Sequence, residues 1–201
     1  MTFILLLLIG YLIGSIPCSY LSMRLLIGRD IRKLGTGQAT VTAVLMHGGK
    51  RAGVIALLGE ILKGVACVFV ANALVGQNWA ILVILVGAVY GCSWSVWLRG
   101  GGGQGLTTGM SGLVLMNVLA VLIMGAWYGI ALGTTRHRIL SNRLFRLSVP
   151  VALASWYWSW EYALAGSFLV LPSFIKEFSR GDDVVKAREA QGVGQNSIGA
   201  G

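Results

Sequence analysis

The stretch from Asn78 to Gly105 reads NWAILVILVGAVYGCSWSVWLRGGGGQG. Its apolar part, which ends at Leu98, has the length of a bilayer span, for which about 20 mostly apolar residues are needed. A glycine run follows at once, from Gly100 to Gly105. Glycine lets backbone N–H groups come close to a ligand, and such loops hold phosphate and other anions. We interpret the stretch as a span that ends in a polar site at the bilayer surface; a flexible turn between two spans is the alternative.

Apolar segments of this kind recur along the chain. Of its 201 residues 56% are hydrophobic and only 11% are charged, against about 25% charged residues in soluble domains. The composition predicts an all-α, polytopic integral membrane bundle, with one domain over residues 1–178 and a polar, disordered cytoplasmic tail over 179–201. Five stretches have the length of a span or nearly so: Phe3–Ile27, Val54–Val75, Trp79–Leu98, Leu113–Leu132 and Leu147–Leu171.

The net charge of +9 is carried mostly at the edges of these stretches. Basic loops stay in the cytoplasm, so the charge indicates membrane topology and not a nucleic-acid partner. We expect the N-terminus outside, and the glycine loop and the C-terminus inside. With five spans the arginine-rich loop 133–146 would face outward; breaks at Asn117 and Glu161 give seven spans and return it to the cytoplasm. The added spans would be Leu106–Met116, Val118–Leu132, Leu147–Trp160 and Tyr162–Phe174.

Several short motifs precede the glycine loop in a fixed order: Gly14-Ser15-Ile16-Pro17, Asp30 to Gly37, Gly49 to Gly53, and Glu60 to Gly64. With the loop, they resemble the signatures of the bacterial membrane acyl-phosphate:glycerol-3-phosphate acyltransferases (PlsY type). The resemblance implies seven spans in the bacterial inner membrane and an active site at the cytoplasmic face. It also implies acyl phosphate and glycerol 3-phosphate as substrates, lysophosphatidate as product, contact with membrane lipid, and no cofactor. The histidines and cysteines show no spacing typical of a metal site.

Two residues are candidates for the catalytic centre. Lys63 lies within an apolar run, where a charge is costly and therefore indicates function, and Glu60 lies one turn earlier on the same helix face, where the two can pair. A purely structural pair near the span entrance is the alternative. Ser15 belongs to the first motif, beside Pro17. Its alternative role is a hydrogen bond to the preceding helical turn.

Phosphate contacts are expected from cations and from glycine-rich backbone. Charge-assisted hydrogen bonds to phosphate are strong, although juxtamembrane bases also contact lipid headgroups and Gly-Thr-Gly is also an ordinary turn. The expected ligands are Arg32, Lys33, Gly35, Thr36, Gly37, Gln38, Arg99, Gly101, Gly102, Gly103, Gln104 and Gly105.

The chain departs from the family pattern at several polar positions. Gln38, Ala43 and Met46 stand where the second signature has asparagine, asparagine and arginine, and Cys92, Gly101 and Gln104 stand where the third has histidine, lysine and lysine. Arg99, Arg24, Lys50 and Arg51 are possible compensating cations. Cys92 has no base beside it in the sequence, which argues against a covalent nucleophile. A non-catalytic or substrate-altered paralogue that binds lipid or phosphate is therefore the alternative function, and a transporter is more distant because no inverted repeat is visible.

Overall fold

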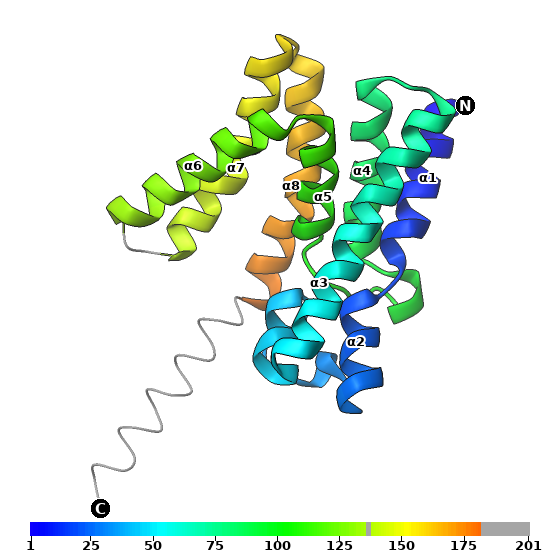
Figure 1. The fold of residues 1–201 in the computed structure, drawn as a ribbon, viewed down its shortest axis with the longest axis vertical. Coiled ribbons are helices and arrows are strands. Elements are labelled where there is room, and N and C mark those ends of the chain that lie inside the picture. Colours follow the sequence, from blue (N-terminus) through cyan, green and yellow to red (C-terminus); the bar gives the residue numbers. More distant parts are fainter. Residues whose placement is uncertain (136–137, 182–201) are drawn as a thin grey trace, which may run out of the picture.

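The computed structural model describes residues 1–135 and 138–181, and in this part of the chain all regular structure is helical. Figure 1 shows the helices running up and down a common bundle, with α6 and α7 leaning away from the others. The elements are α1 (Thr2–Ser15), α2 (Cys18–Ile27), η1 (Ile31–Lys33), α3 (Val41–Leu74), α4 (Asn78–Ser93), η2 (Val96–Leu98), α5 (Leu106–Met116), α6 (Val118–Thr135), α7 (Arg138–Tyr157) and α8 (Trp160–Arg180).

The first apolar stretch is broken where a continuous span was expected. Helix α1 ends at Ser15 and α2 begins at Cys18. Pro17 lies between them, and its ring has no N–H group with which to continue the helical hydrogen bonds. The break turns the chain and leaves the last carbonyl groups of α1 in need of other donors.

Helix α3 begins at Val41, well before the expected span from Val54. The Thr40 side chain caps it by accepting a hydrogen bond from the Ala43 amide at 3.0 Å. At Gly49 the backbone leaves the helical region, with φ at 79° and ψ at 178°, so the helix is kinked there. The sequence analysis placed no helix before Val54, and the missed signal was the threonine cap.

The second half of the chain is divided at the two expected places. Asn117 separates α5 from α6, and its side-chain oxygen accepts the Ala120 amide at 3.0 Å. The other break falls at Trp158 and Ser159, slightly before the expected Glu161, because Ser159 caps α8. Helix α7 also starts at Arg138, earlier than Leu147.

Helices α1 and α4 pack through glycines on both sides. A Cβ added at Gly10 would lie 2.0 Å from the Ile84 carbonyl oxygen, and one at Gly87 would lie 2.3 Å from the Leu7 carbonyl oxygen. Small residues allow this close approach of helix backbones in membranes. The packing holds the end of α1 firmly against α4, where the glycine loop begins.

The bundle is that of a multi-pass membrane protein. In the described residues, the segments Thr2–Ile27, Val41–Leu74 and Asn78–Leu98 are each long and apolar enough to cross a bilayer. The shorter apolar helices Leu106–Met116 and Val118–Thr134 follow, and α7 and α8 complete the bundle (Figure 1). Helix α8 continues to Arg180, past the expected domain end at residue 178; Arg136, His137 and residues 182–201 lie outside the described residues.

Candidate functional site

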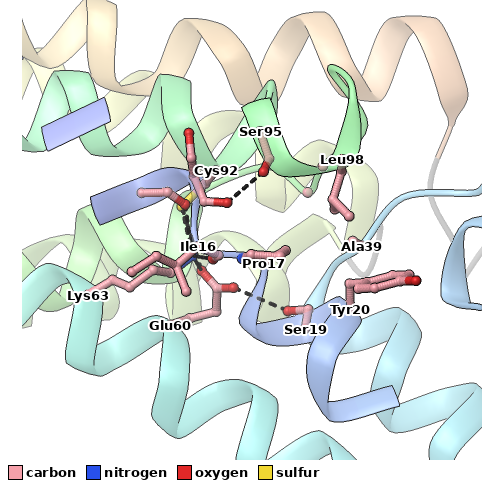
Figure 2. A pocket seen from close by; sticks show the side chains of 14 residues that line it. Ile16, Pro17, Ser19, Tyr20, Ala39, Glu60, Lys63, Cys92, Ser95 and Leu98 are labelled. Atoms are coloured by element: carbon pink, nitrogen blue, oxygen red, sulfur yellow. Dashed lines mark hydrogen bonds and ion pairs between the residues drawn. The ribbon is translucent and has the colours of Figure 1, made fainter. Parts of the chain in front are cut away.

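A cavity opens where the break between α1 and α2 meets α3, the end of α4 and the glycine loop (Figure 2). The space between its lining atoms is about 210 Å³, a figure that includes the open solvent at its mouth. Residues far apart in the sequence meet here, including both candidate catalytic residues. The lining consists of Gly14, Ser15, Ile16, Pro17, Ser19, Tyr20, Ala39, Glu60, Lys63, Cys92, Ser95, Leu98, Gly102 and Gly103.

Lys63 and Glu60 form the expected ion pair on α3. The ammonium lies 2.7 Å from Glu60 Oε2, and both side chains are almost fully buried. Figure 2 shows the pair directed toward Cys92 and the Ile16–Pro17 break. Lys63 Nζ also donates to the carbonyl oxygens of Gly14 at 3.1 Å and Ile16 at 3.0 Å. The pair therefore connects α3 to the end of α1.

Cys92 is enclosed by this same cluster. Its sulfur lies 3.2 Å from Lys63 Nζ, 3.4 Å from Thr108 Oγ1 and 3.7 Å from Glu60 Oε2. The structure thus places ionisable groups beside the thiol, which the sequence did not indicate. The thiol nevertheless is a buried member of a satisfied polar cluster, and buried structural thiols are unreactive.

Three buried polar atoms near the cavity have no hydrogen-bond partner in the described part of the chain. They are Ser15 Oγ, Ser93 Oγ and Gln38 Oε1. Ser15 itself lines the cavity, and its own carbonyl accepts a hydrogen bond from Ser95 Oγ at 2.5 Å. Buried polar groups are nearly always paired, so the unpaired Ser15 hydroxyl in the lining points to a polar ligand.

The glycine loop uses part of its backbone for its own fold. The amides of Gly100, Gly101 and Gly103 donate to the carbonyls of Ser95, Leu98 and Cys92. In the described structure, the amides of Gly102, Gln104 and Gly105 donate to no protein acceptor, so these three amides are not used by the fold of the loop. Of the predicted loop residues, Gly102 and Gly103 line the cavity, whereas Gly101, Gln104 and Gly105 lie outside its lining.

Glycine at position 102 is required by packing. An added Cβ would lie 2.2 Å from the Cys92 carbonyl oxygen and 2.6 Å from that of Ser93. The Gly102 carbonyl in turn accepts the Ala39 amide at 3.2 Å, which joins the loop to the second motif. The loop is therefore a closely packed turn with a defined conformation.

The predicted cations lie at the rim. Arg32 is held by Asp30 through two hydrogen bonds, at 3.0 and 2.7 Å, and stacks over the Tyr20 ring. The hydrogen bond from Arg32 lowers the pKa of the Asp30 carboxyl below its usual range, but the pair is exposed and contributes little to stability. Arg99 and Lys33 are exposed, and neither lines the cavity.

The rest of the second motif lies between the loop and the end of α8. Thr36 and Gln38 are buried, whereas Gly35 is exposed. The Gln38 side-chain amide donates to the Gly181 carbonyl at 2.9 Å, and Arg180 donates to the Gly37 carbonyl at 2.9 Å. These contacts bring the C-terminal end of α8 to the site, which the sequence analysis did not anticipate.

Helix α8 contributes a second cation, Lys176, that sequence reasoning missed. Lys176 is buried and its ammonium lies 5.2 Å from the centre of the Trp94 ring, beside cavity-lining Ser95. In the described residues no carboxylate forms an ion pair with it. No comparable signal was present in the sequence, because Lys176 follows the expected span Tyr162–Phe174 and stands next to Glu177.

Gln104 faces α8. Its side-chain oxygen lies 3.3 Å from Ser173 Oγ, and Ser173 accepts a hydrogen bond from Arg146 at 2.9 Å. Arg146 also forms a buried ion pair with Glu177, to which Arg143 binds at 2.8 Å. Gln104 thus ties the glycine loop to a charged network between α7 and α8.

An all-helical membrane bundle with a polar cavity beside a packed glycine loop defines a membrane protein built to hold a polar ligand at the end of its spans. The family model described as "Glycerol-3-phosphate acyltransferase" matches residues 4–180, and the chain belongs to this family.

Curated relatives carry the same name. The protein from Desulforudis audaxviator is 32% identical over 183 residues, which cover 91% of this chain and 92% of the relative. The protein from Thermosynechococcus vestitus is 33% identical over 184 residues, covering 83% and 85% of the two chains.

The fold matches solved structures of PlsY (YgiH), an integral membrane glycerol 3-phosphate acyltransferase. The glycerol 3-phosphate form superimposes with a TM-score of 0.70 at 21% identity, over 91% of this chain and 94% of the other. The lysophosphatidic acid form superimposes with a TM-score of 0.68 over the same shares. The predicted fold class and family are confirmed.

Proposed function

We propose that this protein transfers a fatty acyl group from acyl phosphate to the 1-hydroxyl of glycerol 3-phosphate, giving lysophosphatidate. Membership of the family supports the reaction. The observation that carries the proposal for the site is Ser15, whose fully buried hydroxyl has no partner in the described structure and lines the cavity beside the glycine loop.

We assign the residues at the cavity two separate tasks, contact with the reacting groups of the substrates and binding of their phosphate. Ser15 hydrogen-bonds the reacting polar groups, and Lys63 acts through the α1 break that it holds. Within the cavity, phosphate is bound by the amide of Gly102, and the cations Arg32, Lys176 and Arg180, which lie outside the lining, supply positive charge around the site. The amides of Gln104 and Gly105 follow on the same loop. Gly101 and Gly103 shape the loop, and Gly35, Thr36, Gly37 and Gln38 shape the facing segment.

The exposed cations act before a substrate enters the cavity. Arg99 and Lys33 lie outside the lining, so we assign them to drawing anionic substrates and lipid headgroups toward the cavity. Cations near a site raise the local concentration of anions, and salt weakens this effect.

A non-catalytic paralogue that binds phosphate or lipid is the second candidate. Three positions favour the non-catalytic paralogue, because Cys92, Gly101 and Gln104 bring no positive charge to the site. The Gln104 side chain is also engaged by Ser173. Binding of phosphate without turnover would follow if the surviving cations suffice for affinity but the chemistry lacks its polarising groups.

The test is an assay of the purified protein with acyl phosphate and glycerol 3-phosphate, with lysophosphatidate as the readout. Gly102→Ala should abolish the product, because its Cβ would lie 2.2 Å from a backbone oxygen. Gly101→Ala is the matched control, since its Cβ would come no closer than 3.1 Å to any neighbour. Equal activity of the two variants would contradict the proposed site.

A further pair of variants separates the two candidate functions. Gly101→Lys combined with Gln104→Lys restores the charges typical of the family and should raise turnover if catalysis has merely weakened. No product from the parent or from this variant, with glycerol 3-phosphate binding retained, would establish the non-catalytic paralogue.

For orientation, we propose that the protein lies in the bacterial inner membrane with the N-terminus outside and the glycine loop and C-terminus in the cytoplasm. Basic loops support this orientation. The test is an impermeant thiol reagent on intact cells, in a Cys18→Ser background. Leu140→Cys, at a position 46% exposed near the start of α7, should be protected, and Trp158→Cys, 94% exposed at the other end, should react. The reverse pattern would overturn the orientation.

A further inference from the structure

We propose that Lys63 is a positioning residue, which fixes the break between α1 and α2 so that Ser15 faces the cavity, and does not itself bind substrate. The inference rests on the proposed acyltransferase function. It assigns to the buried ion pair a role different from the phosphate contact that a lysine in such a cavity first suggests.

The hydrogen bonds of the ammonium group carry the argument. A lysine ammonium has three N–H donors. Four acceptors lie within 3.2 Å of Lys63 Nζ, namely Glu60 Oε2, the carbonyl oxygens of Gly14 and Ile16, and Cys92 Sγ. Every donor is therefore engaged within the protein, and none remains for a phosphate oxygen.

The acceptors show what the ammonium does. In an unbroken helix the Gly14 carbonyl would receive the amide of residue 18, but the Cys18 amide donates to Ile16 at 3.0 Å. Pro17 provides no amide at all. Lys63 supplies the missing donor to the Gly14 carbonyl and binds the Ile16 carbonyl as well, so the backbone on both sides of Ser15 is held in place.

Glu60 keeps the ammonium in position. Thr108 Oγ1 donates to Glu60 Oε2 at 2.8 Å, and Ser19 Oγ donates to Oε1 at 3.3 Å. The carboxylate is thus fixed by α5 on one side and α2 on the other. It also neutralises most of the lysine charge at 2.7 Å, which leaves little field to attract a phosphate.

Steady-state kinetics distinguish the two roles. If Lys63 positions Ser15, Lys63→Met should lower kcat by about 10-fold or more while the KM for glycerol 3-phosphate changes by less than about 3-fold. A direct phosphate ligand would instead raise KM by about 10-fold or more, since a charged hydrogen bond is lost. Leu62→Met, at a neighbouring position of the same helix that is 67% exposed, is the control and should resemble the parent.

The partner residue gives a second kinetic check. Glu60→Gln should reproduce the kcat loss of Lys63→Met, because it frees the ammonium from its anchor. The double variant should lose about as much as either single variant, since residues that act as one unit are not additive. Additive losses, or a KM effect confined to Lys63→Met, would overturn the inference.

A measurement that needs no turnover completes the test. In a Cys18→Ser background, the thiol introduced by Ser15→Cys should react with a small methanethiosulfonate at a rate that Lys63→Met changes by about 10-fold or more, and that Leu62→Met leaves unchanged. An unaltered rate would overturn the inference even if the enzyme is active. A parent that forms no lysophosphatidate would remove the proposed function, while the labelling rate would still decide the role of Lys63.

Discussion

Glycines are used in opposite ways by two parts of this molecule. In α1 and α4, a Cβ at Gly10, Gly87 or Gly91 would come within 2.0 to 2.3 Å of a backbone oxygen of the facing helix. In α6, a Cβ at Gly125, Gly129 or Gly133 would meet nothing within 4 Å. The comparison shows that the half which carries the cavity is held by close backbone packing, and that α6 is not.

The α6–α7 hairpin depends on a different attachment. Helix α7 packs on α8, and the buried Arg146–Glu177 ion pair joins the two helices. Figure 1 shows α6 and α7 leaning away from the rest of the bundle. Close backbone contacts at glycines thus hold α1 on α4, whereas the contact of α7 with α8 combines the buried ion pair with apolar packing, including Gly166 against Pro150.

The largest loss of stability is expected when one partner of the buried Arg146–Glu177 ion pair is removed and the other is left. Glu177→Ala would leave Arg146 buried without its carboxylate, which should lower the free energy of unfolding by about 3–5 kcal/mol. Thermal unfolding of the protein in detergent measures this. Adding Arg146→Met should recover a large part of the loss, and a double variant as unstable as Glu177→Ala would contradict the account.

A smaller loss is expected in the half that is packed through glycines. Gly87→Ala would set its Cβ 2.3 Å from the Leu7 carbonyl oxygen, so α1 and α4 must separate. Overpacking of this kind costs about 1–3 kcal/mol. The same unfolding experiment should show a lower midpoint, and lysophosphatidate formation should fall as well because Ser15 lies at the end of α1. An unchanged midpoint would mean that the two helices are not tightly coupled.

The exposed Arg143–Glu177 ion pair should contribute less to stability than the buried Arg146–Glu177 ion pair. The Arg143 side chain is 42% exposed, although it lies 2.8 Å from the same carboxylate as Arg146. Exposed pairs contribute about 0–1 kcal/mol. Arg143→Met should therefore shift the unfolding midpoint only slightly, and a loss equal to that of Arg146→Met would show that exposure does not set the difference.

The smallest effect is expected in α6 and has the opposite sign. Gly129→Ala places a methyl group where no neighbour lies within 4 Å. Alanine favours the helix over glycine by about 1 kcal/mol or less. The unfolding midpoint should stay constant or rise slightly, and a clear fall would indicate a contact of α6 with another molecule in the membrane.

Local features of the fold were predictable from the sequence. Asn117 marks the end of α5 because its amide oxygen caps the next helix, and charge asymmetry required a break there. The Glu60–Lys63 pair follows from helical spacing alone and is confirmed at 2.7 Å. The start of α3 at Val41 was missed, because its cap was hidden among turn-forming glycines.

Contacts between distant segments explain most of what the sequence did not indicate. The carbonyls that bind Lys63 belong to a helix break almost fifty residues earlier, and their orientation depends on how α1 packs on α4. Similarly, Gln104 matches a position expected to face phosphate, but Ser173 on α8 draws its side chain away. No periodicity or motif specifies such partners.

The contact between the end of α8 and the second motif has a consequence for biosynthesis. The cavity lining ends at Gly103, so its residues have all been synthesised when the chain is about half made. The Gly37 carbonyl and the Gln38 side chain, however, acquire their partners only when Arg180 and Gly181 have left the ribosome. The newly inserted protein therefore passes through a stage in which all residues of the cavity lining are present, but the hydrogen bonds of Arg180 and Gly181 to the second motif have not yet formed.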